Sequence, residues 1–300
     1  MYDIAIIGSG PAGLTAGIYG KRAGLDTVVI DSEPGGGQVL TTYEVDNYPG
    51  LPGINGFDLG MKFKDHATDF GVSFVDDDAT EVAKSADGFT IKTAFDTIEA
   101  RSLIIATGAA HNKLNIPGEE ELAGMGVSYC ATCDGAFFKN KVTAVVGGGD
   151  VALEDAIFLA RTCTKVYLIH RRDTFRGAAK LAQTVMNTPN IEIIYNAIVT
   201  KIEGSDHVES IMLHNNVDNT DTSLTVDGIF VAVGTHPNTE LFKGLVDMND
   251  AGYIIADESC TTSTPGIFVA GDARNKPLRQ IITAAADGAN AATGAAKYLE

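Results

Sequence analysis

The chain has no tryptophan, few cysteines and no long apolar run, and each shortage narrows what the protein can be. Among its 300 residues no apolar stretch approaches the roughly 20 residues that a membrane-spanning helix needs. We therefore expect no membrane partner. The first predicted strand begins at residue 2, which leaves no space for a secretory signal, so we expect a cytoplasmic protein.

Basic residues are also scarce. The 22 lysines and arginines face 39 aspartates and glutamates, which gives a formal net charge of −17. Such a field repels nucleic acid and anionic membranes, so we expect no nucleic-acid partner either. It also makes any local cluster of arginines informative, because an anionic ligand would need one.

The four cysteines are Cys130, Cys133, Cys163 and Cys260. A structural disulfide framework is not expected in a reducing compartment, so the C-x-x-C pair of Cys130 and Cys133 indicates redox chemistry or a metal site. Zinc would need two distant additional ligands there, and it stays open as an alternative. Cys163 and Cys260 have no cysteine or histidine at ligand spacing, so we interpret both as structural thiols.

A glycine-rich fingerprint opens the chain. An apolar strand over residues 2–7 leads directly into Gly8–Gly13, which reads GSGPAG, and a helix is predicted over residues 14–23. This order lets a pyrophosphate approach the backbone and lie on the helix N-terminus. A second strand over residues 27–30 ends in Asp31, whose carboxylate could accept hydrogen bonds from a ribose diol.

The same pattern occurs a second time. A strand over residues 141–146 leads into Gly147–Ala152, a GxGxxA turn, and then into a helix over residues 153–160. Asp31 follows Gly8, the first glycine of the first copy, at the same distance in sequence as His170 follows Gly147 in the second copy. Three arginines come shortly after His170. These are Arg171, Arg172 and Arg176.

The opposite charges at the two strand ends predict two different nucleotides. A carboxylate suits an unphosphorylated ribose, whereas arginines suit a 2′-phosphate through forked hydrogen bonds. We therefore expect FAD at the first fingerprint and NADPH at the second. Either glycine loop could instead be an ordinary strand-to-helix turn, and the His-Arg-Arg run could be a solvated charged face.

Two later segments repeat the design of a returning strand that ends in glycine, over residues 103–108 and 229–234. A glycine ends each one because a nucleotide or a crossover passes close to the backbone. Another strand over residues 266–272 closes on Asp272. A flexible glycine-rich loop is expected over residues 34–38.

This order predicts an α/β protein with two Rossmann-like dinucleotide-binding domains, the second inserted into the first. The FAD-binding domain is expected over residues 1–112 and 237–300. The NADPH-binding domain, which carries the C-x-x-C pair, is expected over residues 113–236. The crossings are expected at residues 112–117 and 234–238, because both contain proline or glycine, as linkers often do.

The C-terminal segment over residues 280–298 is alanine-rich and predicts a helix that Gly288 and Gly294 interrupt. If its N-terminus points at the flavin, the helix dipole would favour the negative charge of the reduced ring. A capping helix without an electronic role is the alternative, and the residues do not separate the two.

Together these motifs resemble the bacterial low-molecular-weight thioredoxin reductases over essentially the full length. The segments that carry the resemblance are Gly8–Gly13, Gly36-Gly37-Gln38 with Thr42, Glu44–Gly50, Ala106-Thr107-Gly108, Cys130–Gly135, Gly147–Ala152, His170–Arg176, Gly271-Asp272 and Arg279-Gln280. The resemblance implies a homodimer whose partner is thioredoxin or a thioredoxin-like protein.

Fingerprints and resemblance together predict two sets of binding residues. The FAD set is Gly8, Gly10, Pro11, Ala12, Gly13, Asp31, Gly37, Gln38, Thr42, Asn47, Ala106, Thr107, Gly108, Gly271, Asp272, Arg279, Gln280 and Ile281. The NADPH set is Gly147, Gly149, Asp150, His170, Arg171, Arg172 and Arg176.

The resemblance also implies the chemistry. NADPH would pass a hydride to the flavin, which then reduces the disulfide of Cys130 and Cys133. Cys133 would face the flavin, Cys130 would attack the thioredoxin disulfide, and Cys133 would resolve the mixed disulfide. We expect Asp134 to act as general acid and base, with a helix-capping carboxylate as its alternative role. Because thiols and nicotinamide share one domain, the resemblance implies that this domain rotates between half-reactions.

Other readings stay open beside this one. Relatives reduced by ferredoxin, or dithiol oxidases that pass electrons to oxygen, keep FAD and the thiol pair but lose the second fingerprint, which this chain retains. A peroxiredoxin-reducing relative would carry an additional N-terminal thioredoxin-like domain. A nucleotide-binding scaffold with a structural zinc thiol pair would be colourless, whereas a flavoprotein is yellow.

Overall fold

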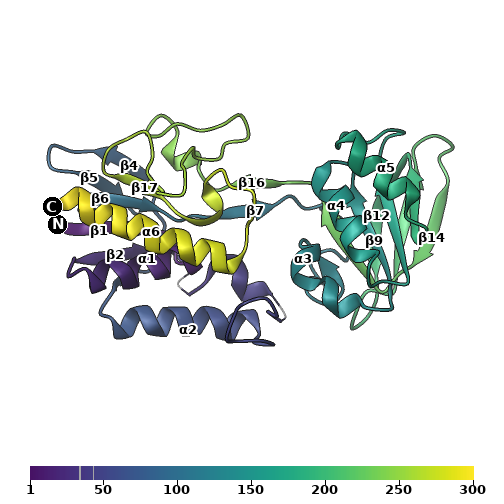
Figure 1. Cartoon of the computed structure of the whole chain (residues 1–300), viewed down its shortest axis with the longest axis horizontal. Helices are drawn as coiled ribbons and strands as arrows, with labels where there is room; N and C mark the ends of the chain where they lie inside the picture. The colour runs from purple at the N-terminus through teal and green to yellow at the C-terminus, as the bar shows by residue number, and fades with distance from the viewer. Residues whose placement is uncertain (34, 43) are drawn as a thin grey trace. The chain divides into compact units, whose positions relative to one another are not determined.

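The computed structural model describes residues 1–33, 35–42 and 44–300 (Figure 1). It divides into unit 1, residues 1–110 and 236–300, and unit 2, residues 111–235. Pro34, part of the loop expected over residues 34–38, lies outside the described residues. Among the described helices, none is both long and apolar enough to cross a membrane.

Unit 1 is built on a seven-stranded sheet with the order β3-β2-β1-β6-β5-β4, in which β17 also pairs with β6. The β1, β2, β3, β6 and β17 pairings are parallel, whereas β4, β5 and β6 pair antiparallel. The strands are β1 Tyr2–Ile7, β2 Thr27–Ile30, β3 Ser73–Val75, β4 Glu81–Lys84, β5 Phe89–Lys92, β6 Thr97–Ile105 and β17 Ile267–Val269.

Alternating side chains of β1 explain why its sequence is apolar throughout. Ile4 and Ile6 lie in the core cluster that includes the helices, whereas Ala5 and Ile7 lie in the cluster on the opposite face. A parallel strand buried on both faces has no polar side to expose. The helices of unit 1 are α1 Pro11–Arg22, α2 Gly56–Asp69 and α6 Ile281–Leu299, with short 3₁₀ turns η1 Gly37–Thr41, η3 Glu240–Phe242 and η4 Gly271–Ala273.

Helix α6 runs through both of its glycines without a break, so the expected interruption at Gly288 and Gly294 is wrong. A side chain at Gly288 would collide with the backbone carbonyl of Ala12, and one at Gly294 would meet the ring of Phe268. The two glycines therefore allow α6 to lie against α1 and β17. Close packing compensates for the intrinsic cost of glycine in a helix.

Unit 2 contains a five-stranded parallel sheet with the order β11-β10-β9-β15-β8. One face is covered by helices, and the antiparallel β12-β13-β14 sheet contributes to the core on the other face. The strands are β8 Val127–Ser128, β9 Val142–Gly147, β10 Lys165–His170, β11 Ile191–Tyr195, β12 Ala197–Glu203, β13 Ser210–Asn215, β14 Asp221–Thr225 and β15 Gly228–Ala232. The helices are α3 Ala131–Asp134, α4 Asp150–Leu159 and α5 Ala179–Asn187, with the turn η2 Gly135–Phe138 after α3.

The chain passes between the units through two short strands, β7 Ala109–His111 and β16 Thr235–Pro237. These pair with each other in a two-stranded sheet of their own (Figure 1). The division between the units falls after residue 110 and after residue 235. The predicted fold class, α/β with one Rossmann-like unit inserted into another, is confirmed.

Candidate functional site

The first glycine loop joins β1 to α1 and is shaped by close backbone contacts. Gly8 has φ +109°, a conformation that other residues rarely adopt, and a side chain there would collide with the carbonyl of Ala106. A side chain at Gly13 would collide with the carbonyl oxygen of Gly8. A Cβ atom placed at Gly10, by contrast, would come no closer to another part of the described chain than 3.8 Å, from the carbonyl oxygen of Gly36. The loop is therefore packed on its inner side and open at Gly10.

The open side of this loop is where helix α1 begins. Gly10 is its N-cap and, being a glycine, provides no side-chain cap for the first turn. Free N–H groups and the positive end of the helix dipole suit a phosphate. The predicted residues Pro11 and Ala12 lie in this turn, and Gly37 of η1 approaches the Cα atom of Gly10.

Asp31 lies at the end of β2, as expected, but its carboxylate already has partners. Its Oδ2 atom accepts a hydrogen bond from the N–H of Ser9 at 2.6 Å, and Oδ1 accepts one from Glu33 at 3.0 Å. The carboxylate thus ties the glycine loop to the strand end. Each of its oxygens retains a second lone pair for a ribose hydroxyl.

Asp272, in the turn η4, and Arg279, a few residues further along the chain, each have one buried polar atom that lacks a hydrogen-bond partner within the described part of the chain. Among the residues that the structure describes, neither the buried Asp272 Oδ1 nor the buried Arg279 Nε has a hydrogen-bond partner. Burial raises the pKa of the Asp272 carboxyl, and Lys276 and Arg279 partly offset this effect. An orphaned acceptor and an orphaned donor are what a bound nucleotide with hydroxyl and carbonyl groups would satisfy.

The remaining predicted FAD residues are held by local contacts in unit 1. Asn47 donates to Gln280 Oε1 at 2.8 Å, which joins positions far apart in the sequence. Gln280 is the N-cap of α6 and forms a capping box with Thr283, and Ile281 is the first residue of that helix. Thr107 donates through Oγ1 to the carbonyl of Asn238 at 2.6 Å. The structure contains Gln38 in η1 and Thr42 just after it, and Gly108 follows β6.

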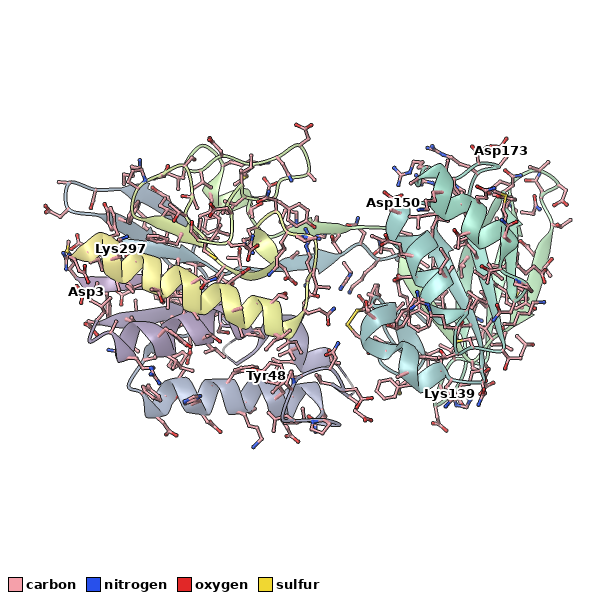
Figure 2. The ribbon with its side chains drawn as sticks, in the orientation of Figure 1. Asp3, Tyr48, Lys139, Asp150, Asp173 and Lys297 are labelled. Atoms are coloured by element: carbon pink, nitrogen blue, oxygen red, sulfur yellow. A yellow bond between two sulfur atoms is a disulfide. The ribbon has the colours of Figure 1, made fainter. Side chains whose placement is uncertain are left out.

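The second glycine loop repeats the inner packing of the first. A side chain at Gly147 would collide with the carbonyl of Ala232 at the end of β15, as Gly8 would with Ala106. A Cβ atom placed at Gly149 would have no described residue within 4 Å other than its neighbours along the chain, so this side of the loop is open. Asp150, at the start of α4 (Figure 2), accepts through Oδ1 from the N–H of Ala178 at 2.7 Å.

The arginine cluster lies beside this second loop. The N–H groups of Arg176 and Gly177 donate to the carbonyl of Gly148 at 2.8 and 3.1 Å. The side chains of Arg171, Arg172 and Arg176 are exposed, and within the described residues no carboxylate forms an ion pair with them. Three exposed guanidinium groups close together in the sequence of an acidic protein have the chemistry that binding of an anion requires.

His170 occupies a different place from the arginines that follow it. Its side chain is 5 % exposed, its ring packs directly on Gly148, and Nε2 lies 2.9 Å from the carbonyl of Thr174. In this position the imidazole supports the loop from beneath. Its contact with a nucleotide stays a prediction.

Cys130 and Cys133 form a disulfide at the start of α3 (Figure 2). Cys130 is the N-cap of this helix, and its sulfur accepts a hydrogen bond from the N–H of Cys133 at 3.2 Å. Both residues are partly exposed, and Thr132 between them is exposed. Cys163 and Cys260 are buried free thiols, as expected of structural cysteines.

Asp134 ends α3 and is coupled to a residue that the sequence did not single out. Burial raises the pKa of its carboxyl, and a hydrogen bond from the Ser128 hydroxyl at 2.6 Å counteracts the rise. Cys130 caps α3, and Asp134 precedes η2 without capping it, because its carboxylate accepts from the Ser128 hydroxyl; the capping alternative is therefore not favoured. No local signal marks Ser128, because its role depends on the turn that follows.

Asp287, inside α6, is a second residue that the sequence motifs did not identify. It accepts hydrogen bonds from Gly271 N–H at 3.0 Å, from two nitrogens of Arg274 at 2.9 Å each, and from Lys276 at 2.7 Å. The side chains of Asp287, Arg274 and Lys276 are each 3 % exposed. Burial would raise the pKa of the carboxyl, but the two cations outweigh it and hold the pKa below its ordinary value. An isolated aspartate in an alanine-rich helix was the available signal.

Known proteins resemble this chain over its whole length. Residues 2–288 match the family described as pyridine nucleotide-disulphide oxidoreductase. A curated relative, "Thioredoxin reductase" from Listeria monocytogenes, is 46 % identical over 301 residues, covering 100 % of this chain and 94 % of the relative.

Two solved structures of nearly equal identity differ in how well they superpose. Thioredoxin reductase from Streptococcus pyogenes MGAS5005 is 40 % identical, covers 100 % of this chain and 98 % of its own, and has a TM-score of 0.96. Thioredoxin reductase from Lactococcus lactis, described as the FR conformation, is 41 % identical, covers 100 % and 99 %, and has a TM-score of 0.68. Sequence divergence does not account for that difference.

Proposed function

Since this chain belongs to the pyridine nucleotide-disulphide oxidoreductase family and, within it, to the thioredoxin reductases, we propose that NADPH, FAD and its own disulfide form the path by which it reduces thioredoxin. It is an oxidoreductase that works with a flavin and a nicotinamide nucleotide. The predicted family and the predicted enzyme class are confirmed. The identities of the two nucleotides and the residues that hold them are the parts we propose.

The observation that carries the proposal is the Cys130–Cys133 disulfide in a unit that also holds its own open glycine loop. A structural scaffold needs no such pairing. The two sulfurs are bonded to each other, which disfavours the zinc alternative. Retention of the second fingerprint with its exposed arginines disfavours ferredoxin or oxygen as the redox partner.

FAD is proposed to lie on unit 1. Its pyrophosphate would lie on the first turn of α1 beside Gly10, and its hydroxyl groups would satisfy the orphaned Asp272 Oδ1. Asp31 would accept from the ribose diol with its remaining lone pairs. Asn47, in the segment after η1, and Gln280, the N-cap of α6, are already hydrogen-bonded to each other and would complete the site.

NADPH is proposed to lie on unit 2. Its pyrophosphate would lie beside Gly149 at the start of α4, and its 2′-phosphate would be bound by Arg171, Arg172 and Arg176. Because the chain has a formal net charge of −17, the additional 2′-phosphate needs local positive charge, and this arginine cluster supplies it.

When bound, the two nucleotides supply an electron pair to the disulfide. The chain's own residues then perform dithiol exchange. The sulfur of Cys130 attacks the thioredoxin disulfide, which forms a mixed disulfide and releases one thioredoxin sulfur that takes up a proton. The sulfur of Cys133 next attacks Cys130, which restores the Cys130–Cys133 bond and releases the second thioredoxin sulfur. Asp134 exchanges protons with these sulfurs.

We also propose that unit 2 changes its arrangement relative to unit 1 between half-reactions. Both the disulfide and the proposed NADPH site belong to unit 2, so they cannot contact one flavin at the same time. Solved relatives of almost equal identity with TM-scores of 0.96 and 0.68 support this idea, because a two-unit family with more than one arrangement gives such a spread. The homodimer and the cytoplasmic location stay predictions.

The decisive experiment is an anaerobic titration of the purified protein with NADPH, with NADH in parallel, followed in the visible spectrum. We expect a yellow protein that near-stoichiometric NADPH bleaches and NADH bleaches poorly. A colourless protein would overturn the flavin assignment. A yellow protein bleached by a dithiol but not by NADPH would overturn the nicotinamide assignment and favour ferredoxin or oxygen.

A further inference from the structure

We propose that Ser128 is a positioning residue for the dithiol chemistry, because its hydroxyl holds the Asp134 carboxyl in place beside Cys130 and Cys133. The inference rests on the proposed function, in which Asp134 exchanges protons with the two sulfurs. Ser128 ends β8, two residues before the first cysteine, and is 5 % exposed.

The hydrogen-bond geometry gives the hydroxyl of Ser128 one orientation. Its single proton points to Asp134 Oδ2 at 2.6 Å, since the other acceptor, the carbonyl of Cys130, lies at 3.4 Å. The same oxygen accepts the N–H of Cys130 at 3.1 Å. The result is a relay from the backbone of Cys130 through Ser128 to the carboxyl of Asp134, in which each bond strengthens the next.

A buried serine does not need a carboxylate to be satisfied, as unit 1 demonstrates. Ser102, which is fully buried in β6, donates its hydroxyl to the carbonyl of Asp3 at 3.0 Å. Most side-chain hydroxyls in proteins find such a backbone partner. Ser128 instead donates to the one acidic side chain that lies within four residues of either cysteine.

The surroundings of Asp134 make this hydroxyl decisive. Cys130 and Cys133 share the turn of Asp134 and titrate only once their disulfide is open. The residues of α4 that pack against Gly135 are the apolar Phe158 and Leu159. Asp155, one turn earlier in α4, has its pKa raised to about 7 by burial and by Glu154. Burial raises the pKa of Asp134, and within the described residues the hydrogen bond from Ser128 is the influence that lowers it. Ser128 thereby keeps a buried carboxyl able to release its proton as well as to hold it.

Proton balance shows why both abilities matter. Opening the Cys130–Cys133 bond consumes two electrons and two protons, and a protonated Asp134 can give one proton to the departing sulfur. Oxidation of the dithiol by thioredoxin releases the same two protons to the two thioredoxin sulfurs, and the Asp134 carboxylate can accept one on the way. A carboxyl locked in either state would perform only half of the cycle.

The test uses the holoenzyme and compares Ser128→Ala with Ser128→Thr, with Ser102→Ala as the control for loss of a buried hydroxyl. Thioredoxin reduction is measured across pH, and flavin bleaching by NADPH is measured separately. We expect Ser128→Ala to lower kcat/KM for thioredoxin about tenfold, the lower end for a hydrogen bond to a charged group. The pH limb that reports Asp134 should move to higher pH, because the bond that favours the carboxylate is gone.

Ser128→Thr should retain the profile, Ser102→Ala should leave it unmoved, and bleaching by NADPH should persist in all three variants. The same Ser128→Ala change in an Asp134→Asn background should add almost nothing, because the two residues act as one unit.

Equal turnover and an unshifted pH limb in Ser128→Ala would overturn the proposal. So would a full additional loss in the Asp134→Asn background, since that would mean Ser128 acts only on folding. If the wild-type protein bleaches with NADPH but reduces no thioredoxin, the proposed function itself fails, and this outcome is distinct because it precedes any variant.

Discussion

The two glycine loops are built alike and differ at their strand ends. Gly8 in unit 1 and Gly147 in unit 2 each pack against the carbonyl of an alanine, Ala106 or Ala232, at the end of the returning strand. At the next strand end, unit 1 has Asp31 bonded into its loop, whereas unit 2 has a buried His170 followed by exposed arginines. Backbone packing therefore gives the two proposed nucleotide sites the same shape, and the side chains at the strand ends are what distinguish them.

The comparison also shows an asymmetry in packing. The third position of the fingerprint is Gly13 in unit 1, where a methyl group would collide with the loop, but Ala152 in unit 2, where one is accommodated. Helix α1 also has α6 against it at Gly288. The loop of unit 1 is thus the more tightly enclosed of the two.

The largest effect is expected from removing the Cys130–Cys133 disulfide, which lies in unit 2. Cys133→Ser should lower thioredoxin reduction by at least about 10⁴-fold, the scale on which loss of a nucleophile acts. Flavin binding should persist, because the proposed FAD residues lie in unit 1. Steady-state assays and the visible spectrum check both parts, and substantial turnover without the second sulfur would contradict the dithiol path.

Unit 1 alone carries a buried charge cluster, and Asp287→Asn should destabilise it by about 3 kcal/mol, because Arg274 and Lys276 would lose their common counter-charge. Hydrogen exchange should locate the loss in unit 1 and spare unit 2. Equal loss of protection in both units would be inconsistent with a local cluster.

The same cluster predicts a pH dependence. The folded-state pKa of Asp287 is held below its unfolded value of 3.8, so the contribution is present above that pH. It disappears as the pH falls through the folded-state pKa. The difference in Tm between wild type and Asp287→Asn should therefore be full at neutral pH and should shrink below about pH 4.

The difference in packing between the two loops can be tested by giving each loop the other's residue at the third fingerprint position, Gly13 or Ala152. Gly13→Ala should cost about 3 kcal/mol through overpacking, and the purified protein should hold less flavin. The matched change Ala152→Gly should cost only about 1 kcal/mol, the ordinary effect of glycine in a helix. Thermal unfolding and flavin content measure both, and equal effects would mean that the two helices approach their loops equally closely.

The smallest expected effect concerns the rim of the second loop. Arg172→Gln should lower kcat/KM for NADPH about tenfold by removing a charge-assisted bond to a 2′-phosphate, while kcat/KM for NADH changes little. Lys165→Gln, which removes a partly exposed cation of unit 2 that is paired with Glu192, is the matched control and should affect neither coenzyme. A parallel fall for both coenzymes would contradict the 2′-phosphate assignment.

What the sequence predicted well was local. The strand, glycine turn and helix of both fingerprints lie within a few residues of their expected bounds, since glycine spacing and apolar runs act over short distances. What it missed depends on contacts between distant segments. Gly288 is tolerated inside α6 because Ala12 lies against it, and Asp287 is satisfied because η4 presents two cations. Ser128 was missed because only the fold of α3 brings Asp134 back to it.

The paired strands β7 and β16 have a consequence for how the gene could be edited. Since the chain leaves unit 1 at residue 110 and returns at residue 236 through strands that are hydrogen-bonded to each other, both cut points lie about one strand spacing apart, near 4.8 Å. A short turn could therefore join them after deletion of the inserted unit. Unit 1, the proposed FAD-binding unit, could then be produced and studied without unit 2.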